Sequence, residues 1–104
     1  MDSAPKLSHT AAMILQAIAA GNRYGLSIME VTGLPSGTVY PALRRLERDR
    51  LVISQWETGN AAEKDGRPAR KYYRPTALGK EVLVASRKRY PHLVTLFVGN
   101  EAIK

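Results

Sequence analysis

"SGTVYPALRRLERDR", residues 36–50, carries the periodicity that decides the fold of this chain. At 100° per residue, its apolar positions gather on one side of a helix, namely Val39, Ala42, Leu43 and Leu46. The opposite side collects small, proline and arginine positions, namely Gly37, Pro41, Arg44, Arg45 and Arg48. We therefore predict a helix that buries one stripe in a core and presents a cationic stripe on its outer face.

Pro41 lies inside this predicted helix and has no N–H to donate to the carbonyl of Gly37. Both residues also allow another backbone to approach closely, because glycine has no Cβ and proline presents a low profile. We expect the segment from Ser36 to Tyr40 to form a loosened first turn that shapes a contact surface at some expense of stability.

Two shorter helices are predicted before this segment. "SHTAAMILQAIAA", residues 8–20, has Ser8 as N-cap and is followed by Gly21, and it is apolar over nearly its whole circumference. It should therefore be buried on more than one side. A second helix from Tyr24 or Gly25 to Thr32 is followed by Gly33 and a short turn. A short helix, a glycine-bearing turn and a longer basic helix outline a helix-turn-helix.

Two strands follow the basic helix. "LVISQWE", residues 51–57, and "RKYYR", residues 70–74, are β-branched or aromatic, and residues 58–69 have the composition of a long hairpin loop. A two-stranded ribbon with a basic tip after a helix-turn-helix is a wing. We expect Tyr73 in the core and Tyr72 on the ribbon surface. Trp56 is expected to anchor the wing strands rather than to stack on a base or ligand.

The C-terminal part is predicted to be helical. Thr76 is a candidate N-cap for a helix that runs to about Arg89 or Tyr90, with inward positions at Leu78, Val82 and Leu83. Pro91 interrupts it, and residues 92–98 form an apolar tail. The expected fold is mainly α with a two-stranded β wing. A winged helix-turn-helix would occupy residues 1–75, and a C-terminal helix with its tail residues 76–104.

The charge distribution points to nucleic acid as a partner. The chain has a net charge of +7 and a pI near 10.1, which attracts polyanions, although basic proteins also bind membranes or acidic partners. Arginine can pair with guanine O6 and N7 or with phosphate, and hydroxyl groups of the first turn can donate to phosphate or base. The predicted DNA contacts are Ser36, Thr38, Tyr40, Arg44, Arg45 and Arg48 of the helix and Arg67, Arg70 and Lys71 of the wing. A solvated basic face and a mobile charged loop are the alternatives.

Other classes of function lack the residues that they need. There is no cysteine, and His9 and His92 lie near opposite ends of the chain without carboxylates at ligand spacing, so neither a metal site nor a cofactor is expected. No serine–histidine–carboxylate grouping or phosphate-binding glycine loop indicates an enzyme. No signal peptide or membrane-spanning run is recognised, which favours a soluble, cytoplasmic protein.

Taken in order, "YGLSIM", "LPSGTVYPALRRLERDRLVISQWE" and "GRPARKYYRPTALG" resemble the PadR-like transcriptional regulators over roughly residues 8–90. The resemblance implies a winged-helix DNA-binding domain, a C-terminal helical element that mediates dimerisation, and usually repression. By matching position, Ser36, Thr38, Tyr40 and the helix arginines would face the major groove. The wing residues Arg67, Arg70 and Lys71 would face the backbone or the minor groove.

This sequence departs from the family pattern at Pro75, where an apolar residue is common, and at Ala77, where an acidic residue often completes a capping box. The dimerisation region is also short. The apolar first helix and tail still predict a dimer interface that contains Met13, Ile14, Leu93, Leu96 and Phe97, with packing of the tail inside one monomer as the alternative.

We therefore expect a sequence-specific, homodimeric regulator of double-stranded DNA, a repressor that binds a near-palindromic operator with half-sites ~10 bp apart. The competing hypothesis is a winged-helix interaction module that docks an acidic partner without reading DNA. The operator sequence and any small-molecule effector are not specified by these residues.

Overall fold

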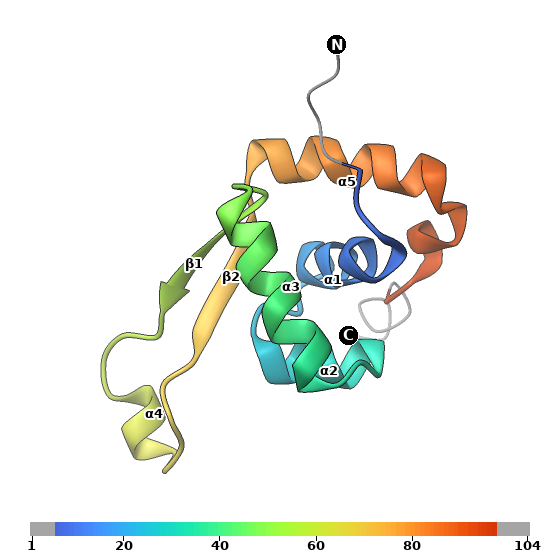
Figure 1. The fold of residues 1–104 in the computed structure, drawn as a ribbon. Helices are drawn as coiled ribbons and strands as arrows, with labels where there is room; N and C mark the ends of the chain where they lie inside the picture. Colours follow the sequence, from blue (N-terminus) through green and yellow to red (C-terminus); the bar gives the residue numbers. More distant parts are fainter. Residues whose placement is uncertain (1–5, 98–104) are drawn as a thin grey trace.

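The structure, a computed structural model, describes residues 6–97 (Figure 1). Its elements, in chain order, are α1 (His9–Ala19), α2 (Gly25–Thr32), α3 (Ser36–Arg48), β1 (Val52–Trp56), α4 (Ala61–Lys64), β2 (Lys71–Pro75), α5 (Ala77–Arg89) and the 3-10 helix η1 (Pro91–Thr95). The helices form one body, and the ribbon of β1 and β2 extends away from it with α4 at its tip. This confirms the predicted mainly helical fold with a two-stranded wing.

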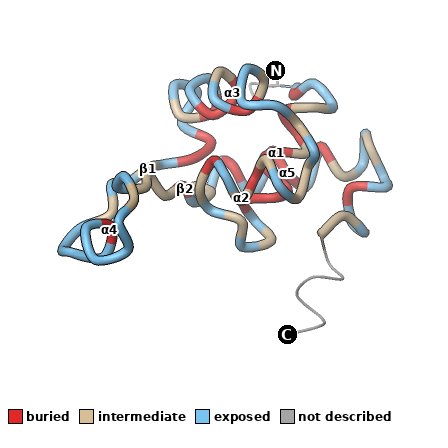
Figure 2. The backbone as a smooth tube through the Cα atoms, turned by 90° about the horizontal axis from the view of Figure 1, so that it is seen from below, coloured by how far each residue is buried: buried red, intermediate tan, exposed pale blue. Residues whose placement is uncertain are grey.

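Helix α1 forms the centre of the core. The Ser8 hydroxyl accepts a hydrogen bond from the Ala11 N–H at 3.1 Å, as an N-cap should. Helix α1 packs against α2, α3, α5, β2 and η1. Ile14, Leu15 and Ile18 are fully buried as a result, and Figure 2 shows buried positions concentrated where the helices face one another. The prediction that this helix is buried on more than one side is confirmed, and the single chain covers it.

Helices α2 and α3 form the predicted helix-turn-helix. Gly33 ends α2 in the left-handed conformation, with a φ of 75°. Helix α3 buries the predicted stripe of Val39, Ala42, Leu43 and Leu46. It ends at Arg48 instead of Arg50, because Arg50 adopts a left-handed φ of 64° in the turn that leads to β1.

The predicted loosening of the first turn of α3 is wrong, because α3 is α-helical from Ser36 onward. The N–H groups of Thr38 and Val39 both donate to the Pro35 carbonyl at 3.0 Å and hold this turn closed. Pro41 follows one turn later, where it removes only its own donor.

Strands β1 and β2 pair antiparallel, with Trp56 opposite Lys71 and Ser54 opposite Tyr73. The connection between them is not the long irregular loop that the sequence predicted, since it contains the short helix α4. The run of helix formers Ala61–Lys64 signals this helix, but the surrounding glycine, asparagine and proline residues mask the signal. Ala62, the buried residue of α4, packs into the tip.

Helix α5 begins at the predicted N-cap, where the Thr76 hydroxyl accepts from the Gly79 N–H at 2.9 Å. Gly79 packs against the backbone carbonyl of Leu51 so closely that a Cβ would clash with it. This contact sets the rotation of α5, which buries Gly79, Val82, Leu83 and Ser86. Leu78, predicted to point inward, is instead 40% exposed.

The C-terminal segment folds back onto the start of α1. Leu93 of η1 is fully buried, and the Tyr90 hydroxyl donates to the Leu7 carbonyl at 3.1 Å. The Nε2 atoms of His9 and His92 lie 2.7 Å apart, within hydrogen-bond distance. The tail therefore packs within the single chain as far as Phe97, while Val98 and the rest of the predicted tail lie outside the described residues. Among residues 6–97, no helix is long and apolar enough to cross a membrane.

Candidate nucleic-acid interface

The outer face of α3 is cationic and accessible. Arg44, Arg45 and Arg48 are all exposed, on the opposite side from the buried stripe. Arg48 contacts Asp49 through a single exposed pair at 3.3 Å, while Arg44 and Arg45 take part in none of the ion pairs of the described residues. Such an exposed pair holds its partners weakly, so all three guanidinium groups are free to bind a ligand.

The first turn of α3 lies beside the start of α2. Ser36 is exposed, Thr38 is half-buried, and Tyr40 is 41% exposed. A Cβ at Gly25 would clash with the phenol ring of Tyr40, so the glycine allows that ring to pack on the backbone of α2. Sequence reasoning missed this role of Gly25, although the Tyr24–Gly25 pair marks the start of the helix.

The wing is linked to α3 through Glu47. The Ser54 hydroxyl donates to Glu47 Oε2 at 2.5 Å, and Lys71 Nζ lies 3.5 Å from Glu47 Oε1. Both contacts use the ribbon face that carries Ser54, Trp56, Lys71 and Tyr73, since alternate residues of a strand share a face. The cationic helix and the cationic ribbon are therefore held next to each other.

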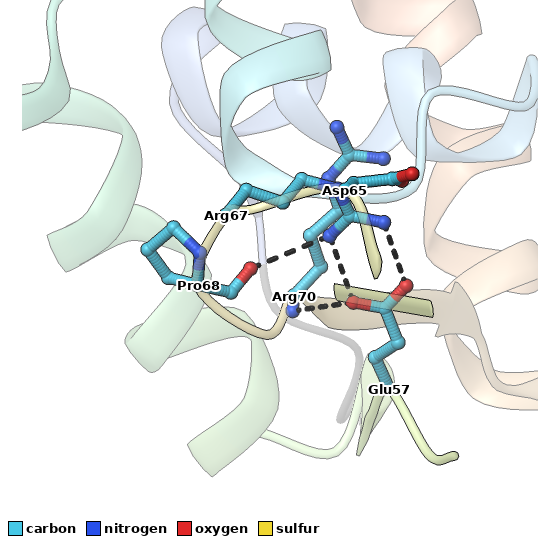
Figure 3. Close-up of polar contacts among 5 residues, drawn as sticks. All are labelled: Glu57, Asp65, Arg67, Pro68 and Arg70. Carbon is cyan, nitrogen blue, oxygen red and sulfur yellow. Dashed lines mark hydrogen bonds and ion pairs between the residues drawn. The ribbon is translucent and has the colours of Figure 1, made fainter. Parts of the chain in front are cut away.

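Arg67, predicted as a DNA contact, braces the tip of the wing (Figure 3). Its Nη1 and Nη2 donate to the two carboxylate oxygens of Glu57 at 2.8 and 2.9 Å, and its Nε donates to Asp65 at 3.3 Å. The Arg70 N–H donates to the same Glu57 carboxylate at 3.1 Å. The hydrogen bond from Arg67 is the main reason that the pKa of Glu57 falls from 4.5 to about 2, and Glu57 in turn raises the pKa of Arg67. The charge of Arg67 is thus largely matched inside the tip.

Arg70 and Lys71, the other two predicted wing contacts, are half-buried. The Arg70 guanidinium carbon lies 4.1 Å from the centre of the Tyr24 ring, a cation–π contact. Tyr24 also meets Tyr72 edge to face, with ring centres 5.6 Å apart. This stack fixes Arg70 next to the start of α2.

A cleft of about 540 Å³ lies between α3, the start of α2 and the wing. Its lining includes Leu26, Tyr40, Arg44, Trp56 and Lys71. The prediction that Trp56 anchors the wing strands is wrong, because Trp56 is 60% exposed. It is the last residue of β1, too far along the ribbon to reach the core. Neither Leu26 nor Trp56 was predicted at a site, since their exposure depends on where the wing lies.

The predicted dimer residues fall into two groups. Ile14 and Leu93 are fully buried within the chain, so in this conformation their side chains cannot contact a second subunit. Met13, Leu96 and Phe97 are partly buried against the core. Three exposed apolar side chains that the prediction did not include lie in α5 and η1, namely Leu78, Val84 and Val94.

No group of three or more metal-ligating side chains occurs within residues 6–97. Lys64 of α4 adds one more exposed cation to the wing tip. The outer face of α3 and the wing together present several exposed or half-buried cations that an extended anion can bind.

Comparison with known proteins agrees with this fold. Residues 14–85 match the model of the transcriptional regulator PadR-like family. A relative described as transcriptional regulator Rv3488 of Mycobacterium tuberculosis is 36% identical over 66 residues, which cover 64% of this chain and 56% of that protein. The match therefore spans little more than half the length of this relative.

Solved structures show the same fold. A PadR family transcription regulator from Clostridium difficile superposes with a TM-score of 0.68 and 24% identity, covering 93% of this chain and 100% of that one. A PadR family transcriptional regulator from Eggerthella lenta has a TM-score of 0.61 and 28% identity, covering 89% and 81% of the two chains.

Proposed function

The chain belongs to the PadR-like family of transcriptional regulators, and on this premise we propose that it represses transcription by binding a near-palindromic operator as a homodimer. Helix α3 of each subunit reads the major groove, and the wing contacts the neighbouring backbone or minor groove. The observation that best supports this proposal is the adjacency of the two cationic elements. Glu47 links Ser54 and Lys71 of the ribbon to α3, so both elements face one partner together.

The residues of α3 divide by their chemistry. Arg44, Arg45 and Arg48 present planar guanidinium groups, which can make paired hydrogen bonds to guanine O6 and N7 or to phosphate oxygens. Ser36, Thr38 and Tyr40 supply hydroxyl donors near the helix N-terminus, where contacts to phosphate fix register. The arginines thereby supply the sequence-reading part of the interface.

In the wing, Arg70 and Lys71 bind phosphate or the edge of the minor groove, and Arg67 acts on DNA only indirectly. Its guanidinium already makes two hydrogen bonds to Glu57, so a direct phosphate contact would have to displace a bidentate ion pair. Lys64 of α4 is an additional exposed cation at the tip, between the exposed carboxylates of Glu63 and Asp65.

The dimer is built by residues 76–104, mainly through the outer face of α5. Along that helix the exposed residues Ala77, Glu81, Val84, Ala85 and Lys88 recur at helical spacing. An antiparallel pair of α5 helices centred between Val84 and Ala85 would bury this stripe and set Glu81 of each subunit opposite Lys88 of the other. Leu78 and the half-buried Met13, Leu96 and Phe97 extend the apolar area available for such contact.

Selection of bound duplexes from a random pool, followed by gel shift with excess nonspecific competitor, tests the proposal. We expect a near-palindromic consensus with half-sites ~10 bp apart. If six or more phosphates are contacted, affinity should fall by roughly a thousandfold or more between ~50 and ~200 mM salt. Light scattering should report a dimer. Absence of any selectively bound duplex at physiological salt would contradict the proposal and favour a module that docks an acidic partner.

A further inference from the structure

We propose that the cleft centred on Trp56, between α3 and the wing, is itself part of the DNA interface and packs against the deoxyribose groups and base edges of the strand that passes between the two elements. This inference rests on the proposed function, and it adds an apolar component to an interface so far described by its charges. Trp56 is then a contact residue for DNA and not part of the protein core.

The position of Trp56 follows from the ribbon register. Ser54 reaches Glu47 of α3, and Trp56, two residues further along β1, shares its face of the ribbon. Lys71 is the cross-strand partner of Trp56, and its Nζ lies 5.9 Å from the indole centre and 3.5 Å from Glu47. The indole therefore faces the same space as the outer side of α3, and it lines one cleft with Arg44.

The exposed apolar surface of the cleft comes from three separate elements. Leu26 of α2 is 52% exposed, Tyr40 of α3 is 41% exposed, and Trp56 of β1 is 60% exposed. Single exposed apolar side chains are common on proteins, but a cluster around one hollow indicates a binding surface. An indole offers a large, rigid area for such contact.

The charges of the cleft select the partner. Arg44, Arg70 and Lys71 line it, and its lining contains neither aspartate nor glutamate. A strand of duplex DNA matches this combination, because its exposed surface alternates phosphates with deoxyribose groups and presents base edges in the grooves. The cleft is also continuous with the arginine face of α3 through Tyr40 and Arg44, so a duplex held by α3 and the wing would pass over it.

The apolar and cationic residues should affect affinity in different ways. A chain with Trp56 truncated loses contact area, but it neutralises as many phosphates and releases as many DNA counterions on binding as the wild-type chain. Its affinity should therefore fall by the same factor at every salt concentration. Truncating Lys71 removes a phosphate contact, so it also reduces the salt dependence. The slope of log affinity against log salt thus separates the two roles.

The test uses the full chain and the operator duplex selected above. The chain has a single tryptophan, so its fluorescence, excited at a wavelength where the five tyrosines absorb little, reports on this cleft. We expect DNA to quench or blue-shift the emission in a saturable titration. Trp56→Ala should weaken operator binding by roughly tenfold without changing the salt slope, and Trp56→Phe should restore most of the affinity. Lys71→Ala should weaken binding and reduce the slope by about 1.

The possible failures can be told apart. If the wild-type chain selects an operator but its fluorescence does not change, or if Trp56→Ala binds as tightly as wild type, the cleft is not a DNA contact and the proposed function stands. If the wild-type chain selects no duplex, the proposed function itself fails. Since Trp56 is mostly exposed, its truncation should leave the fold intact, and the wild-type titration is independent of any variant.

Discussion

Glu57 and Arg67 face each other across the base of the wing tip, joined by two hydrogen bonds of 2.8 and 2.9 Å. The side chain of Glu57 is 10% exposed and that of Arg67 is 21% exposed, so water reaches this pair only partly. The same carboxylate also accepts the Arg70 N–H, directly before β2. Glu57 thus holds together the loop that carries Lys64 and Arg67, and its role can be tested by whether its substitution weakens or strengthens DNA binding.

Glu57→Gln should weaken binding to the selected operator, although it removes a negative charge from a DNA-facing wing. The amide has only one acceptor oxygen, and its NH₂ group opposes an Arg67 donor, so the tip loses its fixed shape. We expect a loss of several-fold in affinity, because the bidentate contact that fixes the tip is replaced by a weaker one. Equilibrium titration at constant salt measures it.

Glu63→Gln is the matched control, because Glu63 lies exposed in α4 of the same tip. It removes the same charge without touching the pair, so simple electrostatics predicts binding that is unchanged or slightly tighter. If Glu57→Gln and Glu63→Gln both strengthen binding, the pair does not position the wing.

The order of the wing tip should also depend on pH. Hydrogen bonding to Arg67 lowers the pKa of Glu57 from 4.5 to about 2, so the folded tip favours the ionised carboxylate. Its stabilising contribution is complete above the ordinary pKa and is lost as pH falls from about 4.5 toward about 2. Amide hydrogen exchange of the Arg70 N–H, measured as a function of pH, should show that its hydrogen bond to Glu57 opens more often as the pH falls through that range. In the Glu57→Gln variant this pH dependence should disappear. Equal protection throughout that range in the wild-type chain would contradict the assignment.

Arginine substitutions on α3 test the reading of the operator. Replacing Arg44 or Arg48 by alanine should weaken specific binding by ~1–3 kcal/mol at a site where the arginine contacts a base, and should relax preference at that base pair. Lys80→Ala removes the same charge from an exposed position on α5 and should have little effect. Unchanged operator affinity in both arginine variants would remove α3 from the recognition role.

The elements that the sequence predicted well are those governed by local rules. Ser8 and Thr76 cap their helices through their own hydroxyl groups, and the stripe of α3 follows from helical period alone. The capping bonds and the stripe join residues within a few positions of one another, so they can be derived from neighbouring residues, although the Thr76 hydroxyl also donates to the Arg50 carbonyl at 2.7 Å.

The sequence predictions that were wrong concern side chains whose neighbours come from other parts of the chain. Leu78 has an apolar side chain at a plausible inward position, but the contact of Gly79 with Leu51 turns it outward. Arg67 looks like a free cation until Glu57, ten residues earlier in the chain, is brought against it. The sequence predicts that Trp56 anchors the wing strands, yet this residue at the end of β1 is 60% exposed. Periodicity predicts which face of a helix or strand a residue lies on, but not how deeply the fold buries that residue.

Gly79 and Gly37 provide a matched test of this dependence on tertiary contact. A Cβ at Gly79 would clash with the carbonyl of Leu51, and the obstacle is backbone that cannot rotate away. A Cβ at Gly37, also inside a helix, would meet nothing within 4 Å. Alanine is favoured over glycine in a helix by roughly 1 kcal/mol, so Gly37→Ala should raise the melting temperature. Gly79→Ala should instead destabilise the fold by about 2–4 kcal/mol, because α5 must move away from Leu51. Thermal unfolding followed by circular dichroism compares the two variants, and equal stability would show that α5 is not held at Gly79.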